Sequence, residues 1–173
     1  VAVASGQVVY DYDVQSGGII WSGSVEQVLG YGPTEMQGGI TQWEELIHPR
    51  DRGEALRLLE VAKQSLTPYD VEYGYRHRDG HYVQMRDRGI FISDENGRAV
   101  RMIGIMQDVT ERKQAEERLR QSEQKYRTII EESKDAVYSS TIEGRLLDIN
   151  PAGVEMFGYS SKEELLKVDI ARD

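Results

Sequence analysis

The segment Asp108–Glu131, DVTERKQAEERLRQSEQKYRTIIE, decides the organisation of the chain, because every other residue lies before it or after it. Small or apolar residues recur in it at alternating steps of four and three, which places them on one stripe of a helix, at the seam positions of a heptad repeat. These positions are Ala115, Leu119, Ser122, Tyr126 and Ile129. The remaining positions mix acidic and basic residues, so the segment predicts an amphipathic helical rod.

The ends and the partner of this helix follow from the same residues. Asp108 is expected to cap it, with Glu111 placed as in a capping box, and Thr110 is an alternative cap. The seam is narrow and about three heptads long, so a lone helix would be marginal in water. We therefore expect a homodimer joined by a two-chain coiled coil through this helix. The alternative is an ordinary amphipathic helix packed on its own domain.

The composition limits the classes of protein. The chain has 173 residues, 39% hydrophobic and 29% charged, which is typical of a soluble globular protein with one domain and part of another. A net charge of −9 argues against a nucleic-acid partner. The absence of cysteine excludes disulfides and thiol chemistry and fits a cytoplasmic location. No apolar run is long enough to span a membrane, so no membrane contact is expected here. The chain begins at Val1, and we expect a piece of a longer protein that can itself be membrane-anchored.

Residues 1–108 predict one α+β domain. Alternating apolar residues indicate strands over 8–14 and 69–77, and the Asp79-Gly80 pair is a strong hairpin signal. The strand over 99–107 is apolar at nearly every position and should be buried or central. The other expected elements are a strand over 19–21, short helices over 24–29 and 33–37, a helix opened by a capping box at Thr41, a long helix from Pro49 capped by His48, and a strand over 81–92.

Beyond the linker helix, assigned to 109–131, the chain repeats its own beginning. Val9-Tyr10 recurs as Val137-Tyr138, and Gly30-Tyr31 recurs as Gly158-Tyr159. Residues 132–173 are therefore predicted to be the N-terminal part of a second copy of the same domain. This part contains no pattern for a long helix or for a set of three long strands.

Several short motifs carry a family resemblance. They are Leu29-Gly30-Tyr31 followed by Pro33-Thr34-Glu35-Met36, Trp43 with the run Ile47–Asp51, Glu72-Tyr73, Asp79-Gly80, the run Met102–Arg112, and in the second copy Asp148–Ala152 and Phe157-Gly158-Tyr159. In their order, spacing and repetition they resemble the PAS sensory domains with a C-terminal PAC segment. The resemblance implies a five-stranded antiparallel sheet cupped around short helices, upstream of a histidine kinase or cyclic-dinucleotide output domain. It also implies that Asp108 and Thr110 form the signal-relaying junction between the last strand and the linker helix.

No catalytic or metal site is predicted. Of the three histidines, His48 is expected to cap a helix and His81 to be solvated. His77 is interpreted as a core histidine or as a polar group facing a pocket. None of them pairs with a serine nucleophile or with a second metal ligand at helical spacing, and no glycine loop of the phosphate-binding kind occurs.

The cofactor remains unknown. In the family that the chain resembles, a photosensory flavin needs a cysteine and a haem needs a histidine on the long helix. The chain has no cysteine and residues 49–64 contain no histidine, which disfavours both groups. A small organic ligand between the long helix and the sheet is one hypothesis, and the alternative is that the aromatic rings only fill the core. The candidate pocket residues are Trp43, Leu58, Tyr69, Tyr73, Tyr75 and His77. The predicted function is a sensor that detects a small ligand or partner and relays a conformational change through the linker helix. The alternatives are a haem or flavin receptor and a purely structural dimerisation spacer.

Overall fold

The computed structural model describes residues 6–32 and 34–167. Contacts within the chain divide it into two compact units, which meet between Gln114 and Ala115. Among the described residues, no helix has both the length and the apolar character that crossing a membrane requires.

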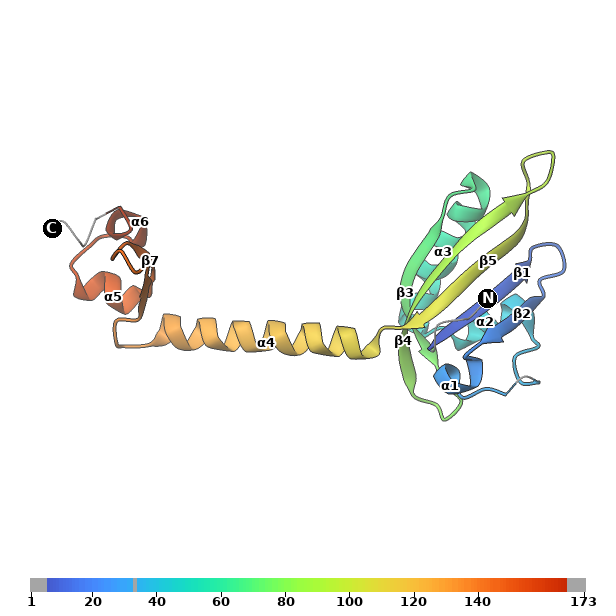
Figure 1. The fold of residues 1–173 in the computed structure, drawn as a ribbon, viewed down its shortest axis with the longest axis horizontal. Helices are drawn as coiled ribbons and strands as arrows, with labels where there is room; N and C mark the ends of the chain where they lie inside the picture. Colours follow the sequence, from blue (N-terminus) through green and yellow to red (C-terminus); the bar gives the residue numbers. More distant parts are fainter. Residues whose placement is uncertain (1–5, 33, 168–173) are drawn as a thin grey trace. The chain divides into compact units, whose positions relative to one another are not determined.

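The first unit is built on a five-stranded antiparallel sheet with the strand order β2-β1-β5-β4-β3 (Figure 1). The strands are β1 (Gln7–Asp13), β2 (Ile19–Gly23), β3 (Tyr69–Arg76), β4 (Tyr82–Ser93) and β5 (Ala99–Asp108). The central place of β5, between β1 and β4, confirms the prediction made from its continuous apolar pattern. The β3–β4 hairpin turns at Asp79-Gly80, where Gly80 has φ 99°, a conformation that glycine adopts without strain.

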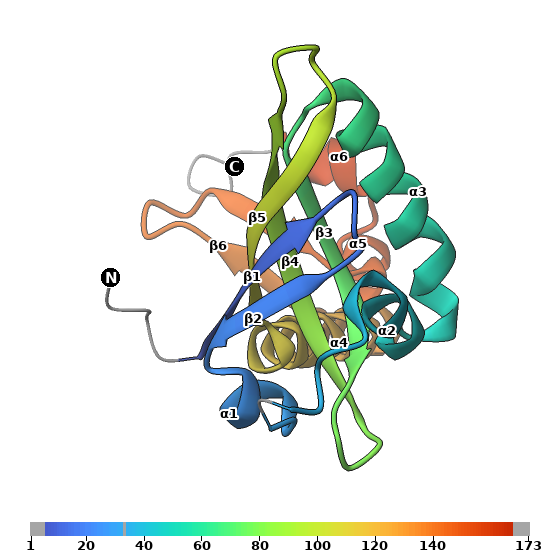
Figure 2. The same ribbon diagram turned by 90° about the vertical axis from the view of Figure 1, so that its right-hand side faces the viewer.

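Three helices accompany the sheet: α1 (Val25–Leu29), α2 (Gly39–Leu46) and α3 (Pro49–Ser65). Figure 2 shows α2 and α3 on the same side of the sheet, and the core of the unit fills the space between them and the inward side chains of the strands. His48 caps α3, because its Nδ1 accepts a hydrogen bond from the Arg50 N–H at 3.2 Å. The predicted α+β class and the predicted cap are both confirmed.

Two local predictions in the segment before α3 are wrong. Thr34 and Glu35 form a turn instead of a helix, and Pro33 lies outside the described residues. Thr41 does not open a helix, because α2 already begins at Gly39. The reason is a tertiary contact: the Ile40 N–H donates to the Gly17 carbonyl at 2.8 Å, and Gly39 approaches Gly17 so closely that a Cβ would lie 2.3 Å from that oxygen. A close backbone contact of this kind has no signature in local residue patterns.

The helix α4 (Thr110–Glu132) starts in the first unit and continues into the second. In the second unit it is followed by the antiparallel pair β6 (Tyr138–Ser140) and β7 (Leu146–Ile149), and by the short helices α5 (Pro151–Met156) and α6 (Lys162–Leu165). Among the residues of this unit that the structure describes, those that form its buried apolar core are Leu146, Ile149 and Leu165. The second unit therefore has a much smaller core than the first.

Candidate functional site

The most unusual side chain of the first unit is Asp87, a carboxyl group in the middle of the core. It lies on β4 in phase with the buried residues Val83 and Met85, so the pleat of the strand directs it inward, and it is only 1% exposed. A buried carboxyl group is costly unless it is hydrogen-bonded or neutralised. The groups around Asp87 therefore decide whether its carboxyl group is charged or neutral.

Asp87 accepts two short hydrogen bonds from tyrosine hydroxyls. Tyr10 on β1 donates to Oδ1 at 2.8 Å, and Tyr73 on β3 donates to Oδ2 at 2.6 Å. The Trp43 indole N–H in turn donates to the Tyr73 hydroxyl oxygen at 2.9 Å. The network thus joins three strands of the sheet and helix α2 through polar atoms inside the core. We call Asp87, Tyr10, Tyr73 and Trp43 the Asp87 network.

Two glycines make room for this arrangement. Gly89 on β4 and Gly104 on β5 are paired across the sheet. A Cβ at Gly104 would lie 2.2 Å from the Tyr10 hydroxyl oxygen, and one at Gly89 would lie 2.6 Å from it. The ring of Tyr10 therefore crosses the sheet over positions that admit no side chain, which is how its hydroxyl reaches Asp87.

Burial controls the protonation of the network. It raises the pKa of Asp87 to about 7, although the hydrogen bonds from Tyr73 and Tyr10 act in the opposite direction. Burial also raises the pKa of Tyr10 and of Tyr73, so both hydroxyls keep their protons. When Asp87 takes up a proton, its new O–H needs an acceptor, and one tyrosine hydroxyl must turn away. Tyr10 has a second, weak acceptor in Met102 Sδ at 4.0 Å.

The space beside the network is small. A core cavity of about 20 Å³ is lined by residues that include Asp87, Trp43 and Tyr69, and it has room for about one water molecule. A haem, a flavin or a drug-sized ligand does not fit in it, since such sites span roughly 300–1,000 Å³. Leu59 lines this cavity, while Leu58 packs half-buried against the core.

The predicted pocket residues thus have different positions. Trp43, Tyr69, Tyr73 and Tyr75 come together in the core around Asp87. His77 does not join them: β3 ends at Arg76, and the half-buried ring of His77 lies at the β3–β4 turn. The interpretation of His77 as a core residue is therefore wrong, because the strand alternation on which it depended stops one residue earlier.

Asp87 was not predicted as a functional residue, although the sequence contains a signal for it. The residues of β4 alternate, and counting by two from Val83 reaches Asp87 and Gly89 on the inward face. A charged residue and a glycine at inward positions of a strand indicate a specific packing arrangement.

The junction between the sheet and α4 uses both predicted relay residues. The Asp108 carboxylate accepts a hydrogen bond from the Thr110 N–H at 2.8 Å. The Thr110 hydroxyl accepts one from the Gln84 N–H at 2.9 Å, and the Gln84 carbonyl accepts one from the Val109 N–H at 2.8 Å. Thr110 thus ties the start of the helix to β4 and does not cap it.

Charge reinforces the junction. Glu72 on β3 forms ion pairs with Arg112 at 2.6 Å and with Lys113 at 2.9 Å, both in the first turn of α4. The hydrogen bond from Lys113 is the main cause of a lowered pKa for Glu72. The start of the helix is therefore attached to two neighbouring strands, β3 and β4.

The predicted seam of α4 is open within the chain. No residue of this helix is buried, and Leu119, Tyr126 and Ile129 are 61%, 66% and 56% exposed. The seam is thus a row of exposed, large apolar side chains at heptad spacing.

The far end of α4 is held by Asn150 of the second unit. The buried Asn150 side-chain amide donates hydrogen bonds to the carbonyls of Ile130 and Asp135, both at 2.9 Å. Its oxygen accepts from the N–H groups of Val137 at 2.9 Å and Gly153 at 3.0 Å, the latter as the N-cap of α5. All four hydrogen-bonding positions of this amide are used.

Comparison with known proteins identifies the family. The model of the PAS fold matches residues 18–106, about half of the chain, and a PAS domain model matches residues 124–173. The chain belongs to the PAS domain family. The matched region is a sensory domain, so the chain is a sensory module of a signalling protein.

The relatives include a probable diguanylate cyclase and a sensor protein. The chain is 26% identical over 135 residues to the probable diguanylate cyclase DgcE of Escherichia coli, covering 77% of this chain and 12% of that protein. It is 25% identical over 156 residues to the sensor protein FixL of Bradyrhizobium diazoefficiens, covering 90% of this chain and 31% of that protein. Among solved structures, a sensory box histidine kinase/response regulator from Burkholderia thailandensis is 32% identical, with a TM-score of 0.62, over 72% of this chain and 92% of that one. The chain thus spans less than a third of these two curated relatives.

Proposed function

We propose that this sensory module converts a change in the core of the first unit into a displacement of α4, which carries the signal to an output domain outside these residues. The observation that carries the proposal is that β4 contacts both the core network and the start of α4. This strand holds Asp87 in the core, and three residues away it holds Gln84, whose backbone binds Thr110 and Val109. A shift of β4 that follows a change at Asp87 therefore acts directly on the first turn of the helix.

The input of the proposed sensor is a small molecule or partner that acts on the Asp87 network from the side of β2. An open groove of about 930 Å³ lies along β2 and is lined by residues that include Ile19, Trp21 and Tyr31. Ile19 and Trp21 also line the small core cavity next to Asp87. A ligand in the groove that moves the Trp21 ring would enlarge that cavity and change the environment of the carboxyl group. Native mass spectrometry of freshly purified protein tests for such a ligand.

The output of the proposed sensor is a change in a homodimer formed through α4. The exposed seam supports this part, because two copies of the helix would bury Leu119, Tyr126 and Ile129 against each other. Because the first turn is attached to β3 and β4, a shift of the sheet would rotate or slide one helix against its partner. The relatives named as a diguanylate cyclase and as a sensor protein are consistent with catalysis in a separate domain of a longer chain.

Hydrogen exchange of the purified chain tests the coupling. We expect Asp87→Asn to alter amide exchange in the first turn of α4, and Thr110→Val to abolish that effect, because valine cannot accept the Gln84 N–H. Thr110→Ser keeps the hydroxyl and is the matched control. If exchange in the first turn is the same in the wild type and in Asp87→Asn, β4 does not transmit the state of the network.

Sedimentation tests the dimer. Leu119→Lys places a charge in the seam and should weaken the dimer strongly, because it removes an apolar contact and brings two like charges together. Gln124→Lys adds the same charge outside the seam and is the control. An unchanged dimer in Leu119→Lys would show that α4 is not the dimer interface.

A further inference from the structure

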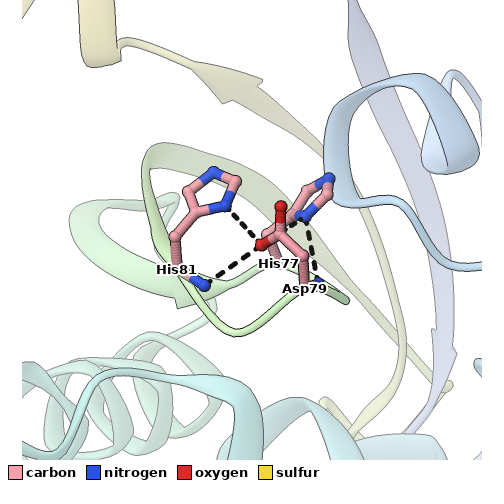
Figure 3. A group of neighbouring side chains, drawn as sticks. All are labelled: His77, Asp79 and His81. Carbon is pink, nitrogen blue, oxygen red and sulfur yellow. Dashed lines mark hydrogen bonds and ion pairs between the residues drawn. The ribbon is translucent and has the colours of Figure 1, made fainter.

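The β3–β4 turn carries a cluster of two histidines and one aspartate, which belongs neither to the Asp87 network nor to the junction with α4. The His77 N–H donates to the His81 carbonyl at 2.8 Å, and the Gly80 N–H donates to the His77 carbonyl at 2.9 Å, so the two histidines stand opposite each other at the end of the hairpin. Their rings stack with centroids 4.5 Å apart and planes 27° apart. Figure 3 shows the Asp79 carboxylate next to both rings.

Nitrogen and oxygen atoms of the kind that bind metals converge in this cluster. Asp79 Oδ1 lies 3.0 Å from His77 Nδ1 and 2.5 Å from His81 Nδ1. One ligand atom from each of the three residues lies within 4.8 Å of the others. Tetrahedral ligands about 2.0–2.1 Å from a zinc ion lie roughly 3.3 Å from one another. Small side-chain rotations are therefore enough to surround one ion.

We propose that His77, Asp79 and His81 form a Zn²⁺ site at the tip of the β3–β4 hairpin. Two imidazoles and one carboxylate are a ligand set that Zn²⁺ accepts, and three protein ligands leave one coordination position for water or for a side chain of another molecule. His77 and His81 do not have the spacing of a helical metal site, and a turn brings them together, so the pair was not predicted from the sequence.

The surroundings of the cluster favour a cation. The His77 ring packs against Gly30, where a Cβ would lie 2.6 Å from the ring Cε1, so it is held on one side. His77 Nδ1 accepts the Asp79 N–H at 3.3 Å, so this nitrogen carries a lone pair, and a bound ion would take the place of that long hydrogen bond. The charge of the neighbouring Arg78 is paired with Glu35 at 3.1 Å. Asp79 and His81 are exposed, so an ion can reach them from solvent.

Calorimetric titration of the tag-free, chelator-treated chain with Zn²⁺ alone tests the proposal. We expect saturable binding of one ion per chain and a rise in melting temperature, because an ion that binds the folded state stabilises it by mass action. His81→Ala and Asp79→Asn should each weaken the binding by about tenfold or more and remove the thermal shift. Both positions are exposed, and Asn-Gly supports hairpin turns as well as Asp-Gly does, so both variants should fold.

The chain offers a matched control for each variant. Asp94 accepts backbone N–H groups of Asn96 and Arg98 in the β4–β5 turn, and Asp94→Asn repeats the chemical change of Asp79→Asn away from the histidines. His48→Asn removes the third histidine and leaves a residue that can cap α3. Both controls should bind Zn²⁺ as the wild type does. The absence of one-to-one binding, or binding that survives in both His81→Ala and Asp79→Asn, would overturn the proposal.

Discussion

Asp87 gives the first unit a pH dependence opposite in sign to that of an ordinary carboxylate. Its pKa is about 7 in the folded chain, against 3.8 for an unperturbed aspartate. Between these values the folded chain binds more protons at this position than the unfolded chain does. Its contribution to stability is therefore complete below pH 3.8 and is lost as the pH rises through about 7. The difference corresponds to roughly 4 kcal/mol in the free energy of unfolding, or about 1.4 kcal/mol per pH unit inside the window.

Asp87→Asn removes this contribution and keeps the shape of the side chain. The amide oxygen accepts one tyrosine hydroxyl, and the amide N–H can donate to the other hydroxyl oxygen. Relative to this variant, the wild type should lose on the order of 3–4 kcal/mol of unfolding free energy as the pH rises from about 4 to 7, and less than about 1 kcal/mol more above that. Urea unfolding followed by tryptophan fluorescence measures this, because Trp21 and Trp43, the two tryptophans of the chain, both lie in the first unit.

Asp70→Asn is the control, since Asp70 lies on the same hairpin but is exposed and bonded to Arg86. The hydrogen bonds from Arg86 lower the pKa of Asp70, so its contribution is present above pH 3.8 and is lost as the pH falls through the folded value. The slope between pH 4 and 7 should therefore be nearly that of the wild type. Equal slopes for the wild type and Asp87→Asn would refute the view that a buried carboxyl group takes up a proton in this window.

Four further substitutions test hydrogen-bonding groups in the core, at the junction and in the second unit. Tyr73→Phe should destabilise the first unit by about 1–3 kcal/mol in urea unfolding, because Asp87 and Trp43 lose a partner. Tyr75→Phe should be neutral or slightly stabilising, because the buried Tyr75 hydroxyl has no partner among the described residues. A larger loss in Tyr75→Phe than in Tyr73→Phe would contradict this. Asp108→Ala should cost about 1 kcal/mol locally and speed amide exchange in the first turn of α4 without unfolding the sheet. Asn150→Ala should expose the β6–β7 pair to proteolysis at a protease concentration that leaves the first unit intact, because four hydrogen bonds are lost together. Equal resistance of the variant and the wild type would show that Asn150 does not hold the second unit together.

The features that local pattern could predict are those that depend on neighbouring residues alone. The alternation in β3 and the Asp79-Gly80 turn are local; the turn is found as predicted, and the strand is found up to Arg76, one residue short of the prediction. The start of α2 was not predictable in this way, because it depends on a contact with Gly17, far away in the sequence. Asp87 lies between these cases: the phase of β4 predicts that it points inward, but its two tyrosine partners come from β1 and β3 and appear only when the sheet is assembled.

The two ends of α4 are held by different kinds of contact, and this difference bears on the proposed relay. At its start, Thr110 and Val109 bind the backbone of Gln84, so the first turn follows β4. At its far end, Asn150 binds the Ile130 carbonyl with a side chain that also caps α5. Between these contacts no side chain of the helix is buried within the chain. The contacts at its two ends are therefore what a rotation of the helix about its axis would have to change, and in a dimer the opposing seam would fix its set of stable positions. A sensor of this design needs its partner helix to define the two states between which β4 selects.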